Sequence, residues 1–215
     1  MDDSVTDGRV LKGNGTRQLI LARTVQIASV EGLNGLSLGR LATELSISKS
    51  GVFALFGSKE ELQLETVRAA RGIFVREVVE PVRSEPDGLA KVVRLCDSWL
   101  DYSRRRVFSG GCFFFAASAE FDARPGRVRD ELAKAAAAWE QGMADLLEAA
   151  RVRGELREYA DPEQIAFELI SFMEAANANS VLHDDEAPYA RAATAVRGRL
   201  RAAAEGVAVP GPLLR

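Results

Sequence analysis

The chain has 215 residues, of which 47% are hydrophobic and 27% are charged, so a soluble globular protein with an apolar core is expected. One histidine, His183, and two cysteines, Cys96 and Cys112, argue against a disulfide scaffold, a zinc site and histidine-based catalysis, and no cofactor is expected. The net charge of -3 is unusual for a nucleic-acid-binding protein, whose affinity comes largely from Lys and Arg against phosphates.

The negative charge is not spread evenly along the chain. Between residues 9 and 59 the acidic side chains are Glu31 and Glu44, and the basic ones are Arg9, Lys12, Arg17, Arg23, Arg40, Lys49 and Lys59. The N-terminal quarter is therefore locally basic, which favours contact with phosphates. Because the sequence has no run of about 18 apolar residues and no secretory signal, we expect no membrane partner and a cytoplasmic location.

A flexible arm is expected over residues 1–15, since this glycine-containing segment shows no sustained periodicity. Thr16 can cap the first helix, which should end before Gly32. Its apolar positions recur at the spacing of one buried helical face, at Ile20, Leu21, Thr24, Ile27 and Ala28.

Three serines predict the starts of the next helices. Ser37 can cap a short helix over residues 38–45, and Ser48 can cap a third helix that ends at about Phe56. Ser58 opens a fourth helix that ends near residue 81, with a capping box in which Glu61 reaches back to the Ser58 amide.

Further helices are predicted downstream over about residues 89–106, 112–121, 128–151, 162–181 and 188–204. The strongest start is Asp161-Pro162, because Asp is a good N-cap and Pro is favoured at the first helical position. No alternating pattern bounded by hairpin turns is present, so the expected fold class is all-α, with about nine helices.

The segment 37–56 has the features of a helix-turn-helix, in which one helix crosses the DNA backbone and the next enters the major groove. Ala42 is small where the two helices would touch, Ser46 forms the turn, and Ile47 fills the corner. The second helix is apolar on its inner side, at Val52, Leu55 and Phe56. Its outer side, which would face DNA, carries Ser48, Lys49, Ser50, Gly51 and Ala54.

Two points stay open from these residues alone. Phe53 fits either the core or a contact with sugar or a thymine methyl group. The three short capped helices also fit a small helical bundle without a DNA site.

The run from Ser48 to Leu62, SKSGVFALFGSKEEL, resembles the recognition helix and the start of the fourth helix in TetR-family (tetracycline-repressor-like) regulators. Upstream, Ile20-Leu21, Gly32, Ser37, Leu41-Ala42 and Ile47-Ser48 fall at the spacing usual in that family. The resemblance covers about residues 16–62.

The resemblance implies a homodimer in which each N-terminal domain binds one half of a near-palindromic, double-stranded DNA operator. It also implies that Ser37 and Lys59 contact phosphates, and that Ser48, Lys49, Ser50, Phe53 and Ala54 face the groove. This sequence departs from the family pattern at Ser46, where glycine is usual, and at Ala54 and Leu55, where tyrosine and histidine are frequent. The operator sequence therefore does not transfer from other members.

The resulting domain organisation has four parts. A flexible arm (1–15) precedes a helix-turn-helix DNA-binding domain (16–62), a ligand-binding and dimerisation domain (63–206) and a flexible tail (207–215).

Most aromatic residues lie in the C-terminal part, where they can line a ligand cavity or fill a core. The predicted cavity residues, chosen from inward faces of different helices, are Trp99, Phe114, Trp139, Met143, Phe167 and Met173. A largely apolar small molecule is the expected ligand, with Asp97 or Glu120 available for a polar group. Cys112 fits either a redox sensor near Cys96 or a small buried hydrophobe.

Small and apolar residues on the last two helices can pack inside the chain or, as the resemblance implies, form a four-helix dimer interface. The predicted interface residues are Ala175, Ala176, Ala192, Val196 and Leu200.

The sequence thus predicts a DNA-binding transcriptional regulator that is not an enzyme, a homodimeric repressor released by a small-molecule effector. Two alternatives remain: an activator of the same family, and a helical small-molecule carrier, or a helical enzyme, without a specific DNA site.

Overall fold

The computed structural model describes residues 3–204, 206, 208–211 and 213, with side chains from residue 15 onwards. Within these residues there are nine α-helices and no strand, apart from an isolated bridge between Leu156 and Ala204. The helices are α1 (Asp3–Glu31), α2 (Leu38–Glu44), α3 (Lys49–Phe56), α4 (Lys59–Phe74), α5 (Leu89–Arg104), α6 (Phe113–Phe121), α7 (Arg127–Val152), α8 (Pro162–His183) and α9 (Ala187–Ala203). The all-α prediction is confirmed. None of these helices is long and apolar enough to cross a membrane.

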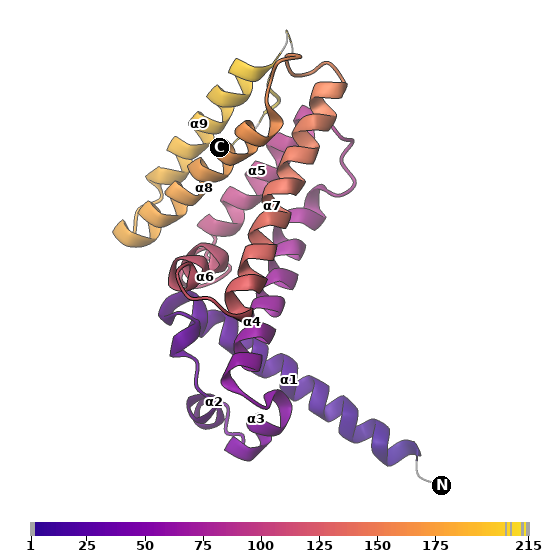
Figure 1. Ribbon diagram of the computed structural model, residues 1–215, viewed down its shortest axis with the longest axis vertical. Helices are drawn as coiled ribbons and strands as arrows, with labels where there is room; N and C mark the ends of the chain where they lie inside the picture. The colour runs from indigo at the N-terminus through magenta and orange to yellow at the C-terminus, as the bar shows by residue number, and fades with distance from the viewer. Residues whose placement is uncertain (1–2, 205, 207, 212, 214–215) are drawn as a thin grey trace.

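Helices α1 to α3 and the beginning of α4 form one end of the molecule, and α5 to α9 form the other (Figure 1). Helix α4 runs from one end into the other with α7 beside it, while α8 and α9 pack together along one side. The predicted domain boundary after residue 62 falls inside α4. Thr66 lies beyond that boundary, yet its Oγ1 donates to Thr24 Oγ1 of α1 at 2.9 Å.

Local capping fixes the helix starts largely as the sequence predicts. The Ser37 hydroxyl accepts from the Arg40 amide at 3.1 Å, and the Ser48 hydroxyl accepts from the Gly51 amide at 3.0 Å. Asp161 accepts from two amides at the start of α8.

The predicted capping box at α4 is only half formed. The Ser58 hydroxyl accepts from the Glu61 amide at 3.1 Å, but the Ser58 amide donates to the Phe56 carbonyl at 2.8 Å. The Glu61 carboxylate instead forms an ion pair with Arg127 at the start of α7. A charged partner from another helix therefore replaces the local backbone partner, which sequence spacing alone does not show.

The ends of the chain differ from the sequence-based boundaries. Helix α1 begins at Asp3 rather than near Thr16. The side chains of residues 1–14 lie outside those described, so the flexibility of the arm stays a prediction.

Part of the predicted flexible tail packs against the domain, whereas Ala208 and Gly211 are exposed. Val209 packs against the core, Leu213 is buried, and Arg197 donates to the Pro210 carbonyl at 3.2 Å. The apolar side chains of Val209 and Leu213 account for this difference, since burying them is favourable. Residues 207, 212, 214 and 215 lie outside the described part.

The turn between α2 and α3 is tight and strained. Ala42 is buried, Ile47 packs partly buried against the core, and the Ile47 amide donates to the Ala42 carbonyl at 2.9 Å. Ser46 has φ of 54°, in the left-handed region that glycine adopts without a steric penalty. The departure from glycine noted in the sequence therefore has a physical cost.

Replacing Ser46 by glycine is expected to raise the free energy of unfolding by about 0.5–1 kcal/mol. Glycine relieves the backbone strain in the folded state, and this gain exceeds the loss from the greater entropy of the unfolded chain. Ser46→Ala, which keeps the β-carbon, is the control and should give no gain. Urea denaturation monitored by circular dichroism measures both variants. A Ser46→Gly variant less stable than the parent would contradict the strain assigned to this turn.

Candidate DNA interface and ligand cavity

Helix α3 divides cleanly into a buried and an exposed side. Val52 is fully buried and Phe56 is 5% exposed, while Leu55 packs partly buried against the core. The outer side carries Ser48, Lys49, Ser50 and Ala54, all exposed, and Gly51, half-buried. These positions match the orientation that the sequence predicts.

Phe53 belongs to the exposed side. Its side chain is 57% exposed, so the core alternative for this residue is wrong. Its ring lies beside the exposed serines and Lys49 of the same helix, so it is available for the sugar or thymine contact that the sequence left open.

Lys49 is the cation on this surface that is free to bind. Among the described residues it forms no hydrogen bond and no ion pair. Lys59 instead donates from Nζ to the Asn34 carbonyl at 2.6 Å, and Ser37 is exposed with its hydroxyl engaged in capping. Phosphate contacts at Ser37 and Lys59 therefore stay predictions.

Most described arginines of the basic N-terminal region are paired inside the domain. Arg17 contacts Glu65 at 2.9 Å and donates to the Leu55 carbonyl at 3.0 Å, which joins α1 to α3 and α4. Arg23 and Arg40 both bind Glu44, and the hydrogen bond from Arg40 lowers the pKa of that carboxyl. These pairs offset little of the excess positive charge counted in the sequence, because Glu44 was already counted and, among the described residues, Lys49 and Lys59 have no acidic partner.

Gly51 has a structural role that the sequence reasoning missed. A β-carbon at this position would lie 2.9 Å from the Ser48 hydroxyl. Glycine therefore leaves room for the cap of α3, in addition to any close approach to DNA.

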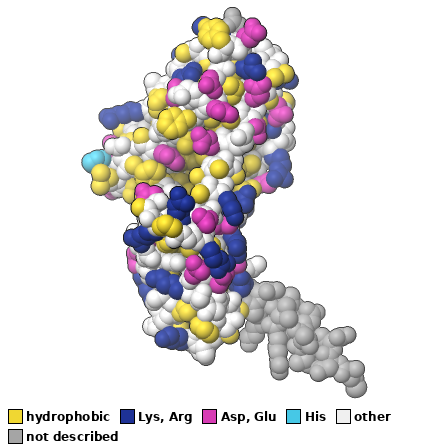
Figure 2. Space-filling model, in the orientation of Figure 1, with side chains coloured by type: hydrophobic (Ala, Val, Ile, Leu, Met, Phe, Trp, Pro, Cys, Tyr) yellow, Lys and Arg dark blue, Asp and Glu magenta, His cyan; other side chains and the backbone are white. Residues whose placement is uncertain are grey.

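A cavity of about 530 Å³ lies in the C-terminal part, between α4 and the π-helical turn that follows it (Val75–Val79), α5, α6, α7 and α8. Figure 2 shows it as a recess lined by hydrophobic side chains with acidic groups at its edge. Its lining includes Phe74, Val75, Val79, Trp99, Cys112, Phe114, Phe115, Ser118, Trp139, Phe167, Ile170 and Glu174. Among the described residues, no cluster of three or more His, Cys, Asp or Glu is placed to hold a metal ion.

Four predicted cavity residues, Trp99, Phe114, Trp139 and Phe167, line this space. Met143 and Met173 do not, because both are fully buried in the core behind it. The two carboxylates suggested for a polar group, Asp97 and Glu120, also lie outside the lining. The acidic lining residues are Asp122, Glu140 and Glu174.

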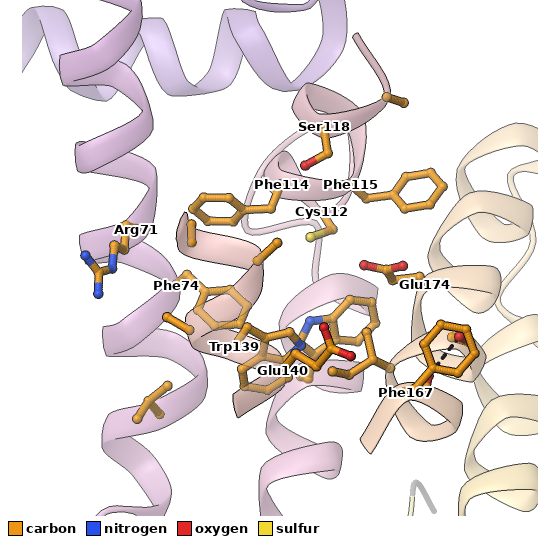
Figure 3. A pocket seen from close by; sticks show the side chains of 18 of the residues that line it. Arg71, Phe74, Cys112, Phe114, Phe115, Ser118, Trp139, Glu140, Phe167 and Glu174 are labelled. Atoms are coloured by element: carbon orange, nitrogen blue, oxygen red, sulfur yellow. Dashed lines mark hydrogen bonds between the residues drawn. The ribbon is translucent and has the colours of Figure 1, made fainter. Parts of the chain in front are cut away.

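The cavity residues missing from the sequence-based set come both from α4, which was not expected to contribute, and from helices that were. Phe74 belongs to α4, whose far end was not assigned to the cavity, and its ring meets that of Trp139 edge to face at 5.1 Å. Phe115 and Glu174 lie on helices already assigned to the domain (Figure 3). The aromatic run 113–115 is the signal that points to Phe115.

Both cysteines are buried and form no disulfide. Burial raises the pKa of each thiol, to about 12 for Cys96. A thiol that stays protonated at neutral pH is a poor nucleophile, which favours the interpretation of Cys112 as a small buried hydrophobe.

The two ends of the molecule are joined by hydrogen bonds from α1 and the turn that follows it to the segment 107–121. Glu120 of α6 accepts from the Leu33 and Asn34 amides at 2.7 and 2.9 Å. Gln26 donates to the Val107 carbonyl at 3.0 Å and accepts from Ser109.

Gly110 lets the two backbones meet at this junction. Its amide donates to the Ser29 hydroxyl at 3.1 Å, and a β-carbon here would overlap the Ser29 carbonyl at 1.8 Å. Only glycine fits this position without displacing α1.

Most of the predicted dimer-interface residues are buried inside the single chain. Ala176, Ala192, Val196 and Leu200 are at most 5% exposed and lie where α8 and α9 pack within the chain. They therefore cannot form a surface for a partner, and only Ala175 of the predicted set is exposed. On α9 the outward face carries small residues at every fourth position, namely Ala190, Thr194, Gly198 and Ala202.

Comparison with known proteins agrees with this geometry. Residues 20–66 match a family model described as bacterial regulatory proteins, tetR family, and residues 88–196 match one described as tetracyclin repressor-like, C-terminal domain. No curated protein sequence is significantly similar to the chain.

Solved structures share the fold at low sequence identity. A TetR transcriptional regulator from Chloroflexus aurantiacus is 21% identical, with a TM-score of 0.79, over 88% of this chain and 94% of its own. A TetR-family regulator from Cytophaga hutchinsonii is 19% identical, with a TM-score of 0.80, over 91% and 98%. AibR, solved with isovaleryl coenzyme A and operator DNA, is 16% identical, with a TM-score of 0.63, over 75% and 85%.

The two phenylalanines on opposite sides of α3 should respond differently to truncation. Phe56→Ala is expected to lower the free energy of unfolding by about 3–5 kcal/mol because it empties a buried site. Phe53→Ala should change stability by less than about 1 kcal/mol, since its side chain is already in solvent, yet weaken DNA binding. Chemical denaturation and gel-shift titration measure the pair. Equal destabilisation by both variants would contradict the orientation of α3.

Proposed function

The chain belongs to the TetR family of transcriptional regulators, and from this premise we propose how its parts divide the work of a ligand-released repressor. Regulators of this family are DNA-binding repressors with a ligand-binding C-terminal domain. Here α3 reads one half of a near-palindromic operator, and the cavity behind α6 binds the effector. The protein acts by binding rather than by catalysis, as regulators of this family generally do.

The observation that carries the DNA-binding part is the exposed side of α3. Phe53 is more than half exposed and Lys49 has no partner among the described residues, while Val52 and Phe56 of the same helix are buried. A helix held rigidly by its inner side and presenting serines, a lysine and an aromatic ring outward suits base and phosphate contacts. Ser48, Ser50 and Ala54 complete this surface.

The signal between the two sites runs through α6. This helix supplies Phe114 and Phe115 to the cavity wall, and its Glu120 holds the turn that follows α1. A ligand that favours a different position of α6 therefore favours a different position of the DNA-binding end. AibR, which has a similar fold, was solved in complex with isovaleryl coenzyme A and operator DNA, which supports a small-molecule site and a DNA site in one such fold.

A homodimer is proposed through the outward face of α8 and α9 rather than through the residues named from the sequence. This face carries small residues, which let helices approach closely, and the exposed apolar side chains Val181 and Leu182. Two recognition helices must lie about 34–36 Å apart to enter successive major grooves. An effector that changes this spacing therefore releases the protein from its operator.

Two alternative functions, an activator and a carrier, each predict a result that differs from that of a repressor. An activator of the same family binds the same kind of operator but raises transcription, which a reporter assay separates from repression. A helical carrier without a DNA site keeps its cavity but shows no preference for operator over scrambled DNA.

A charge reversal at Lys49 tests the DNA-binding role. Lys49→Glu is expected to weaken binding to DNA from upstream of the gene by roughly 10- to 100-fold, because each subunit places a carboxylate against the DNA. Lys134→Glu, on the exposed side of α7, is the matched control and should bind as the parent does. Gel-shift titration at constant salt gives both affinities.

Equal losses for Lys49→Glu and Lys134→Glu would show a general charge effect and remove the assignment of α3. If the parent itself binds this DNA no better than scrambled DNA, autoregulation is excluded.

A further inference from the structure

One half-buried carboxylate in the cavity wall has no partner among the described residues. Glu174 of α8 is half-buried, and among the described residues it forms neither a hydrogen bond nor an ion pair. Two other carboxylates on the C-terminal helices are paired: Glu168 binds Arg199 and Gln164, and Glu148 binds Arg151. Glu140 also lines the cavity without a partner among the described residues, but its side chain is exposed to solvent. Burial alone, with no neighbouring cation, raises the pKa of Glu174.

The surroundings of Glu174 are aromatic and lack a cation. In Figure 3 its carboxylate points into the space between Phe115, Trp139 and Phe167. The charged lining residues are Asp122, Glu140, Glu174 and Arg71. Arg71 lies across the cavity on α4, with its guanidinium directed away from the other labelled side chains.

This arrangement is unfavourable without a ligand. A carboxylate that is partly withdrawn from water loses part of its solvation energy. A hydrogen-bond donor or a positive charge next to it offsets this loss. Aromatic faces around it attract cations as well, and both effects are stronger in a water-poor cavity. An anionic ligand would be repelled by the same carboxylate and by the negative faces of the aromatic rings.

We propose that the cavity binds an organic cation with an apolar body, whose positive group lies beside Glu174 while the body packs against Phe74, Phe114 and Trp139. The proposal rests on the effector-binding role given to this cavity and adds the ligand's chemical class. It refines the apolar ligand expected from the sequence. A volume of about 530 Å³ is in the range of cavities that enclose small molecules.

The chain contains its own reporter of cavity occupancy. Its two tryptophans, Trp99 and Trp139, both line the cavity, so quenching of intrinsic fluorescence follows binding. Suitable probes are phenylalkyl-trimethylammonium ions of increasing chain length. Each is compared with its neutral isostere, in which a tert-butyl group replaces the trimethylammonium group, and with the phenylalkanoate anion of equal length.

The cation is expected to bind the parent protein at least about tenfold more tightly than the neutral isostere, as a charge-assisted contact requires. In Glu174→Gln, a variant of nearly unchanged shape, the preference should disappear while the affinity for the neutral isostere is retained. Glu168→Gln, which removes a paired carboxylate on the same helix, is the control and should keep the preference.

Four results would overturn the proposal: no binding of any cation up to its solubility limit, equal affinity for cation and isostere, tightest binding of the anion, or a preference that survives in Glu174→Gln. Operator binding is measured separately by gel shift without probes. A parent protein that binds the upstream DNA no better than scrambled DNA would count against autoregulation, whereas a parent that binds this DNA specifically but shows no cation preference would overturn only the ligand class.

Discussion

The hydrogen bonds from the Leu33 and Asn34 amides to Glu120 are the constraint on which the relation between the two ends of the molecule depends. The two amides lie at the turn where α1 ends, and the carboxylate satisfies donors that would otherwise need water. Gly110 brings the backbone of the same segment against α1, where a larger residue would not fit. These contacts connect α6 directly to the DNA-binding end.

The start of α6 is fixed by a second polar network inside the C-terminal part. Asn177 of α8 accepts from the Cys112 amide at 2.8 Å and from the Ser103 hydroxyl at 3.0 Å. The Ser103 hydroxyl also contacts the Tyr189 hydroxyl of α9 at 2.9 Å. Because these groups are buried, they are held in one arrangement. The cavity wall is thus tied both to the DNA-binding end and to the helices proposed to form the dimer.

Features set by neighbouring residues were predicted from the sequence, and features set by assembly were not. The caps at Ser37, Ser48 and Asp161 depend on side chains within three residues, so the helix starts were foreseen. Which face of a helix meets which neighbour is decided only when all helices pack, so Met173 and Val196 were assigned to the cavity and the dimer although they lie in the core. The missing partner of Glu174 is visible only once the surrounding helices are in place.

Hydrogen–deuterium exchange with operator DNA tests the coupling between the two ends most directly, because it requires no effector. Linkage demands that a site which changes DNA affinity also responds to DNA. We expect slower exchange at residues 33–35 and along α6 when operator is added, and no such change with scrambled DNA at the same salt. Protection confined to residues 37–62 would contradict the coupling, since the cavity wall would then be independent of DNA binding.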